Sequence, residues 1–300
     1  MLMNISLKSK KGLNALGVFG AMSREKKLFE LLKKLAVQSG KLALPYYGKI
    51  ASQSKLVPLH AHVRETPVTA LDHGIQELVL ASLLQNGYED YAFNGEEDTH
   101  LKFFFPQELD NGICIHCDPI DGTKAFVNGT FAFCVGFGLS RMRKGKHEFF
   151  ASVVYNPIAK QLYWAYDGKT SAHSPMVPPQ KIAFSKFRIT PEGKKAVEAL
   201  GYSFGERGSA HLGIIETALG QSAYCALRHI EVHDALIPYA FARAMGIVPV
   251  DVAGKKLGPL FDLPIKNHKF ERIPSIIYFS GKEAQKELLP ILQNPHYMQQ

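Results

Sequence analysis

Apolar positions recur with the period of a helix over two stretches of the N-terminal half. From Ser23 to Gly48 they return every three or four residues. This spacing predicts an amphipathic helix with Ser23 as its N-cap, ending near Gly48. A second helix is predicted to start at Thr69 or Asp72 and to end at Gly87, because isoleucine, valine and leucine recur at the same spacing between them.

Short apolar runs, rich in β-branched and aromatic residues and separated by turn residues, predict strands in the middle of the chain. These predicted strands cover residues 91–93, 113–117, 131–139, 149–155 and 161–166. The last three follow one another closely, which is typical of an antiparallel meander. Pro119 cannot continue a hydrogen-bond ladder, so the strand of residues 113–117 is expected to stop at Asp118.

The C-terminal half alternates helical and extended patterns. Helices are predicted at residues 196–200, 210–219 and 235–245, and extended segments at residues 222–227 and 247–252. The proline-rich residues 174–179 form the best candidate linker. The sequence therefore predicts a flexible tail (1–22), an N-terminal α+β metal-binding part (23–180) and a C-terminal α/β part (181–300) that carries the specificity residues.

Composition sets the general class of the protein. With 300 residues, 46% of them hydrophobic, the chain can bury a large core. No run approaches the ~18 apolar residues that span a bilayer, so we expect no membrane association. Four cysteines in a chain of this length do not make a disulfide scaffold. Cys114 and Cys117 are interpreted as core residues in a reducing, cytoplasmic compartment.

The net charge of +8 comes largely from lysines and arginines near the N-terminus. No basic stripe interleaved with aromatic residues follows, so a nucleic-acid partner is not expected. A positive field near a site would attract a phosphorylated substrate. The alternative is that the N-terminal lysines form the solvated face of a helix.

The candidate chemistry is concentrated in Asp118-Pro119-Ile120-Asp121-Gly122-Thr123. Two carboxylates three residues apart, with the Ile120 carbonyl between them, offer the hard oxygen ligands that suit Mg²⁺. The N–H groups of Gly122 and Thr123 can point at an anion if a short helix begins there. The alternative is an ordinary Asp-Pro and Asp-Gly turn.

Two more carboxylates stand where they can join this motif. Glu96 follows Gly95 at the end of a predicted strand, and Asp234 stands at the start of a predicted helix. Strand ends in one sheet can bring Glu96 beside Asp118 and Asp121, which would make a two-metal site for phosphoryl transfer. A plain N-cap role would also explain Asp234.

Four blocks of the chain together resemble one known family. The sequence between Met22 and Leu263 is similar to the inositol monophosphatase superfamily of Mg²⁺-dependent, lithium-sensitive phosphomonoesterases. The matching blocks, in order, are Val68-Thr69-Ala70-Leu71-Asp72, Gly95-Glu96-Glu97, Asp118 to Thr123, and Val153-Val154-Tyr155-Asn156-Pro157. The resemblance implies an α/β fold, a layered α-β-α-β-α sandwich of the inositol monophosphatase and fructose-1,6-bisphosphatase type. It also implies a homodimer that hydrolyses a small phosphorylated metabolite.

The resemblance also implies a role for each matching residue. Glu96, Asp118 and the Ile120 carbonyl would hold one metal ion, and Asp118, Asp121 and Asp234 a second. Glu96 would also touch a loosely held third ion, and Thr123, supported by Asp72, would orient the attacking water. Gly122 and Thr123 would bind the phosphate, with Asp121, Asp234 and Ser209 also in contact with substrate. His211 is a weaker candidate for such a contact than Ser209.

Departures from the family pattern keep three functions open. His233 replaces the usual tryptophan, and Leu227 stands where inositol-specific members carry a glutamate that contacts ring hydroxyls. The first function is a phosphomonoesterase of broad or inositol type, which the complete set of ligands favours. The second is a 3'(2'),5'-bisphosphate nucleotidase or another sugar phosphatase, suggested by Lys124. The third is a non-catalytic binding protein, kept open by His233 and Pro238.

Overall fold

The computed structural model describes residues 22–59, 62–110, 112–172, 180–185, 189–205 and 207–298. The predicted tail, apart from Met22, and the predicted linker at residues 174–179 lie outside these ranges.

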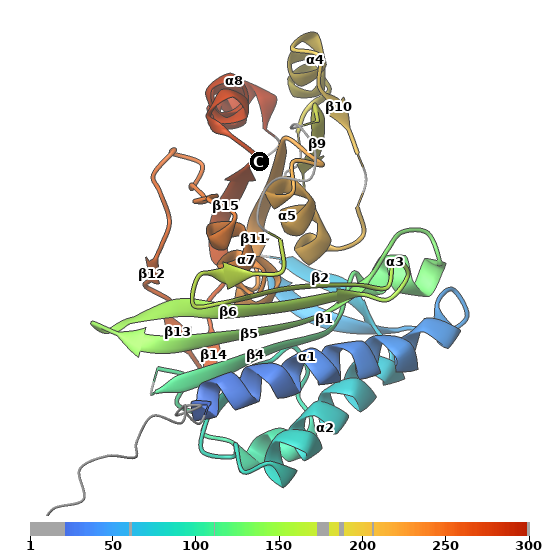
Figure 1. The fold of residues 1–300 in the computed structure, drawn as a ribbon. Coiled ribbons are helices and arrows are strands. Elements are labelled where there is room, and N and C mark those ends of the chain that lie inside the picture. Colours follow the sequence, from blue (N-terminus) through green and yellow to red (C-terminus); the bar gives the residue numbers. More distant parts are fainter. Residues whose placement is uncertain are drawn as a thin grey trace, which may run out of the picture.

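The described chain forms five layers in the order helices, sheet, helices, sheet, helices (Figure 1). The first outer layer holds α1 (Arg24–Ala43) and α2 (Ala70–Gln85). The central helices are α5 (Ala210–Ala218), α6 (Val232–Leu236) and α7 (Tyr239–Ala244), and the last layer holds α4 (Pro191–Ala199) and α8 (Lys282–Gln293). The predicted layered sandwich is confirmed.

The first sheet has seven strands, in the order β3-β4-β5-β6-β7-β8, with β12 paired to β6. Its strands are β3 (Ala92–Gly95), β4 (Ile113–Asp121), β5 (Cys134–Arg143), β6 (Lys146–Asn156), β7 (Gln161–Tyr166), β8 (Lys169–Thr170) and β12 (Leu260–Phe261). Only β3 and β4 run parallel among these pairs. Because β12 comes from the C-terminal half, the two halves of the chain share this sheet.

The second sheet has four strands, in the order β10-β9-β11-β15. These are β9 (Ile182–Ser185), β10 (Ser203–Phe204), β11 (Tyr224–Ile230) and β15 (Ile273–Phe279). The remaining elements are the hairpins β1 (Gln53–Leu59) with β2 (His62–Val68) and β13 (Ile265–Lys266) with β14 (Lys269–Phe270), the helix α3 (Thr123–Asn128), and the 3₁₀ turns η1 (Leu44–Tyr46), η2 (His100–Phe104) and η3 (Pro295–Tyr297).

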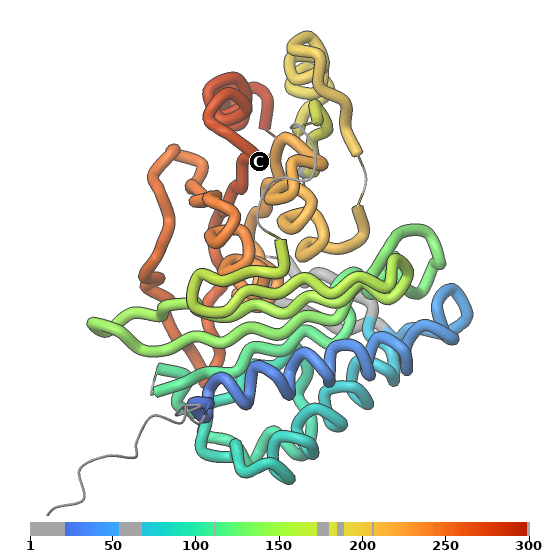
Figure 2. The backbone as a smooth tube through the Cα atoms, viewed as in Figure 1, coloured from blue at the N-terminus to red at the C-terminus, as the bar shows by residue number. Residues whose placement is uncertain are grey.

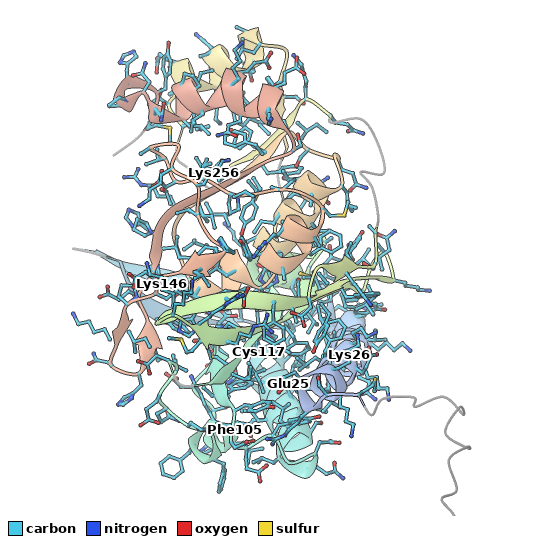
Figure 3. All side chains as sticks on the ribbon, turned by 60° about the vertical axis from the view of Figure 1, so that its left-hand side comes forward. Glu25, Lys26, Phe105, Cys117, Lys146 and Lys256 are labelled. Atoms are coloured by element: carbon cyan, nitrogen blue, oxygen red, sulfur yellow. The ribbon has the colours of Figure 1, made fainter. Side chains whose placement is uncertain are left out.

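Three apolar clusters fill the spaces between successive layers. The first lies between the large sheet and helices α1 and α2, and Cys117 and Phe105 of this cluster are labelled in Figure 3. The second lies between the two sheets around the central helices, and it contains Cys114. The two cysteines therefore face opposite sides of β4, as an alternating strand requires. The third cluster lies under α4 and α8.

Helix α1 begins as its sequence predicts and carries lysines on its outer face. The Ser23 hydroxyl accepts a hydrogen bond from the Lys26 N–H at 3.2 Å. Lys26 and Lys33 both pair with Glu30, and both ammonium groups lie over the Phe29 ring. These lysines belong to a helix face, which fits the simpler interpretation of the N-terminal charge. Every described helix is too short or too polar to cross a bilayer.

Three local predictions are wrong for reasons of backbone geometry. Strand β4 continues through Pro119 to Asp121, because the register shifts between Asp118 and Asp121 and the missing proline N–H falls inside that bulge. The predicted helix of residues 235–245 is divided at Pro238 into α6 and α7. The segment of residues 247–252 forms only isolated bridges at Val250.

The backbone trace shows how the halves meet (Figure 2). Helices α1 and α2 lie on one side of the large sheet, and most of the chain after residue 190 lies on the other side. The segment from β12 to β14 returns to the large sheet, where the Lys269 ammonium lies 2.7 Å from a carboxylate oxygen of Asp98. The loops that follow β3 and β4 thus face residues from the C-terminal half.

Candidate metal and phosphate site

The parallel pairing of β3 and β4 places Glu96 beside Asp118. Gly95 lies opposite Cys117 in the ladder, and the Glu96 N–H donates to the Cys117 carbonyl at 3.1 Å. Parallel strands end at the same edge of a sheet, so the residues that follow each strand meet there. One carboxylate oxygen of Glu96 lies within 4.8 Å of Asp118.

Asp118 is buried without a hydrogen-bonding partner. Its side chain is 1% exposed, and neither carboxylate oxygen has a hydrogen bond among the described residues. Burial is the main cause that raises the pKa of Asp118 well above its usual value, and the charges of Glu96, Asp121 and Asp234 raise it further. A buried carboxylate surrounded by other carboxylates needs a cation to be stable in its ionised form.

Asp121 and Asp234 complete this carboxylate group from two different elements. One oxygen from each of Asp118, Asp121 and Asp234 lies within 4.8 Å of the others. Asp121 ends β4, whereas Asp234 lies in the first turn of α6. The N-cap of α6 is Glu231, so the alternative reading of Asp234 as an N-cap is wrong.

Thr123 links the motif to helix α2. Its hydroxyl lies 3.0 Å from the Ile120 carbonyl and 3.5 Å from an Asp72 oxygen. Asp72 also accepts hydrogen bonds from the Thr69 N–H and hydroxyl, each at 2.7 Å, as part of a capping box. Burial raises the pKa of Asp72 to about 6, although these bonds from Thr69 oppose the shift.

The Asp121-Gly122-Thr123 turn packs closely on the loop that precedes α5. Gly122 has φ of +95°, and a Cβ there would lie 3.1 Å from the Gly208 carbonyl carbon. A Cβ on Gly208 would lie 2.1 Å from the Ala125 Cβ. Glycine is needed at both positions, at Gly122 for its left-handed backbone and at Gly208 for the close approach. The next residue, Ser209, caps α5 and donates its hydroxyl proton to Asp121.

We predict that Gly208→Ala destabilises the protein by about 1–3 kcal/mol, because the added methyl overlaps Ala125. It should also lower turnover, because the Asp121-Gly122-Thr123 turn must move. Gly74→Ala in α2 is the matched control, since no described atom lies within 4 Å of a Cβ there. That change should stabilise the helix by about 0.5–1 kcal/mol. Thermal unfolding measures both changes in stability. Equal melting temperatures for the two variants would contradict the close approach of Gly208 to Ala125.

Two histidines and a cysteine lie among the carboxylates. A ring nitrogen of His233 lies within 4.8 Å of oxygens of Glu96 and Asp118. His211 is fully buried, and its Nε2 and Nδ1 atoms lie 3.7 Å from oxygens of Asp118 and Asp121, respectively. The sequence pattern indicated the altered His233 and only weakly indicated His211.

Cys134 was not indicated by the sequence at all, because it occupies an ordinary apolar position of β5. Its proximity to the motif follows from the strand register, in which Asp121 lies opposite Cys134. A single sequence gives no signal for such a cross-strand neighbour until the register of the two strands is known.

The predicted site residues do come together, with two exceptions in their expected contacts. Glu96, Asp118, Asp121 and Asp234 converge as described, and Asp72, Ile120, Gly122 and Thr123 surround them. Ser209 is 2% exposed with its hydroxyl bonded to Asp121, so a direct contact with substrate stays a prediction. Leu227 is 1% exposed in the core between the sheets, so the idea that it faces a substrate is wrong.

The donor set fits divalent metal ions. The unpartnered Asp118 oxygens, the adjacent carboxylates and the Ile120 carbonyl are hard oxygen donors at one sheet edge. The negative charges of these carboxylates repel one another. Among the described residues, no lysine or arginine contacts Asp118 to compensate this repulsion. The geometry suits cations held on two sides of Asp118, with Glu96 on one side and Asp121 and Asp234 on the other.

Comparison with known proteins agrees with this fold. The model of the inositol monophosphatase family matches residues 25–293. The chain therefore belongs to the inositol monophosphatase family.

Individual relatives show lower and more local similarity. Inositol monophosphatase 2 of Saccharomyces cerevisiae is 37% identical over 101 residues, which are 34% of this chain and 32% of that protein. Histidinol-phosphatase of Chlorobaculum parvum is 32% identical over 100 residues, or 33% of this chain and 34% of that protein. The matched segments thus span about a third of the length of these curated relatives.

Solved structures share the fold over nearly the whole chain. An IMPase/NADP phosphatase, complexed with NADP and Ca²⁺, superposes with a TM-score of 0.72 at 18% identity, covering 93% of this chain and 100% of that one. A Thermotoga maritima IMPase gives a TM-score of 0.67 at 17% identity, covering 89% of this chain and 96% of that one. At these identities the likeness concerns the fold.

Proposed function

We propose that the protein is a Mg²⁺-dependent phosphomonoesterase that hydrolyses a small phosphorylated metabolite with activated water. The observation that carries the proposal is Asp118, a buried carboxylate that has no hydrogen-bond partner among the described residues and is common to both groups of converging carboxylates. Membership of the family supports it, since the curated relatives above are named as phosphatases.

In this proposal Glu96, Asp118, Asp121, Asp234 and the Ile120 carbonyl hold the ions. When bound, Mg²⁺ would neutralise phosphate charge and activate water. The chain's own contribution is to fix these oxygens before substrate arrives: Asp121, for example, is held by the Ala210 N–H at 3.1 Å and the His211 N–H at 2.6 Å.

Thr123 is suited to orient the attacking water. A hydroxyl has one proton, which Thr123 can donate to Ile120 or to Asp72. Its lone pairs are then available to accept a hydrogen bond from the attacking water, which would turn the water oxygen toward the phosphorus. The N–H groups of Gly122 and Thr123, at the start of α3, are free of the helix ladder and can bind phosphate oxygens.

The proposed activity is tested with a panel of candidate substrates that the relatives and the sequence suggest. The panel contains inositol 1-phosphate, histidinol phosphate, NADP and adenosine 3',5'-bisphosphate. We expect release of phosphate from at least one of them in Mg²⁺, loss of release in EDTA, and recovery when Mg²⁺ is added back. Full activity in EDTA would overturn the metal mechanism. Preference for adenosine 3',5'-bisphosphate would select the nucleotidase alternative.

Three further features belong to the same proposal. The chain is divided into a metal-binding part (23–180) and a part that selects the substrate (181–300). Substitutions that change substrate specificity should therefore lie in the second part.

Lithium should inhibit the hydrolysis, as in a staphylococcal inositol monophosphatase obtained as an LiCl-soaked inhibitory complex. We also expect a homodimer, which light scattering tests, and a cytoplasmic location, which cell fractionation tests.

A further inference from the structure

Asp121, Cys134 and His211 form a compact, fully buried group of three metal-ligating side chains. The His211 Nδ1 lies 3.7 Å from Asp121 Oδ2 and 3.8 Å from Cys134 Sγ, and Cys134 Sγ lies 3.7 Å from Asp121 Oδ2. The three donor atoms are therefore the corners of a nearly equilateral triangle. These atoms are oxygen, sulfur and nitrogen, whereas the donors of the proposed Mg²⁺ site are all oxygens.

The hydrogen bond that His211 makes places a proton on one of its ring nitrogens. Its Nε2 lies 3.0 Å from the His233 carbonyl, which can only accept a hydrogen bond. Nε2 therefore carries the proton, and in the neutral ring Nδ1 presents a lone pair toward Asp121. A histidine that donates one ring N–H to a backbone carbonyl and offers the other nitrogen is typical of metal ligands.

The position of the ring is also fixed, because β5 leaves room for it at a glycine. A Cβ on Gly136 would lie 2.4 Å from His211 Cε1 and 2.5 Å from Nδ1. The Asp121 carboxylate is held in turn by Ser209 and by the N–H groups of Ala210 and His211. All three donors are thus held in place before any ion binds.

The size of the triangle fits a transition metal. A point equidistant from three atoms at these separations lies about 2.2 Å from each, and zinc bonds to nitrogen, oxygen and sulfur are about 2.0–2.3 Å. Two electron-rich atoms, Nδ1 and Asp121 Oδ2, face each other at a distance too long for a hydrogen bond. An ion between them would bind both lone pairs, in place of the hydrogen bonds that the Cys134 thiol can make to Oδ2 or to Nδ1.

We propose that Asp121, Cys134 and His211 bind one Zn²⁺-like divalent ion at a site that shares Asp121 with the oxygen-lined Mg²⁺ site. Nitrogen and sulfur donors favour Zn²⁺ and Co²⁺ over Mg²⁺. With Cys134 as thiolate and Asp121 ionised, the ion and its ligands have no net charge, which suits full burial. Binding releases the Cys134 thiol proton to solvent. Because Asp121 serves both sites, an ion held here should compete with Mg²⁺ and lower hydrolysis.

The test is a Co²⁺ titration of the full chain in excess Mg²⁺, followed by absorption spectroscopy. We expect one Co²⁺ per chain, a thiolate-to-cobalt charge-transfer band, release of about one proton, and loss of the band when Zn²⁺ is added. Cys134→Ala should remove the band, and His211→Ala should weaken Co²⁺ binding by more than roughly tenfold. Cys114→Ala, at a buried cysteine seven residues before Asp121, is the matched control and should keep the band.

Several results would overturn the proposal. They are Co²⁺ binding without a charge-transfer band, a band that survives in Cys134→Ala, or no Co²⁺ bound in excess Mg²⁺. If Cys134→Ala does not fold, His211→Ala and proton release still decide between a metal site and a hydrogen-bonded cluster. Asp118→Asn separates the two proposals, because it should abolish hydrolysis while the cobalt band remains. If the wild type shows the cobalt charge-transfer band but no phosphatase activity, only the proposed function is contradicted.

Discussion

Asp118→Asn should abolish hydrolysis and at the same time stabilise the metal-free protein. Asparagine keeps the shape of the side chain but removes the negative charge that the proposed ions need. We expect kcat/KM to fall by about 1,000-fold or more, which corresponds to roughly 4 kcal/mol of lost transition-state stabilisation.

The expected gain in stability follows from the sign of the pKa shift. Burial and neighbouring carboxylates raise the pKa of Asp118 above its value in the unfolded chain. A carboxyl shifted in this direction destabilises the folded state at pH values above the unfolded pKa. Removing it should raise the melting temperature of the EDTA-treated protein by about 2–4 °C, the shift for about 1 kcal/mol in a large domain.

Added Mg²⁺ should reverse the order of stability of the two proteins. The wild type should be stabilised by about 2.7 kcal/mol when Mg²⁺ exceeds its dissociation constant a hundredfold, and Asp118→Asn much less. Asp262→Asn is the control, because that side chain is 79% exposed beside Lys146. An Asp118→Asn protein that is less stable than wild type in EDTA would contradict the idea of an uncompensated buried charge.

The elements near the N-terminus could be predicted because their local signals agree with one another. The Ser23 cap, the apolar period after it, and the Thr69–Asp72 capping box all specify helices at the observed positions. The motif at the end of β4 is equally informative, since Asp-Gly-Thr at a strand end determines both the Asp121 carboxylate and the start of α3. For these segments the tertiary structure adds little to the local pattern.

The C-terminal errors arise where proline and long-range pairing decide the structure. Residues 247–252 are rich in valine and isoleucine, but Pro249 lacks an N–H, and within this segment only Val250 forms β-bridges to described residues. Pro238 likewise divides one helical pattern into α6 and α7. Leu227 faces the interior because β11 pairs with β15 in a register that the sequence does not reveal.

The donor group of Asp121, Cys134 and His211 shows the same limit at the site. Its members come from β4, β5 and α5, and they meet only through the β4–β5 register and the packing of α5 on that sheet. Sequence spacing can identify ligands from one turn, but it cannot bring together residues that are 13 and 90 positions apart.

Gln76 was not a candidate from sequence, yet we expect it to hold the loop that carries Glu96. It is fully buried on α2, and its amide N–H groups donate to the Glu97 carbonyl at 2.6 Å and to the Thr99 hydroxyl at 2.9 Å. Its amide oxygen accepts from the Glu97 N–H at 3.0 Å. Gly95 leaves the necessary space, since a Cβ there would lie 2.3 Å from that amide oxygen.

Gln76→Leu should therefore destabilise the protein by about 2–5 kcal/mol, because it removes the hydrogen bonds that the Gln76 amide makes to the N–H and carbonyl of the buried residue Glu97. The freed loop should also move Glu96 away from Asp118, so that the Mg²⁺ concentration for half-maximal activity rises by roughly tenfold or more. Gln85→Leu makes the same change at an exposed position of the same helix and should alter stability by less than about 0.5 kcal/mol. Chemical denaturation and Mg²⁺ titration of both variants measure the two effects separately. If Gln76→Leu loses stability but keeps the wild-type response to Mg²⁺, the amide supports the fold without positioning Glu96.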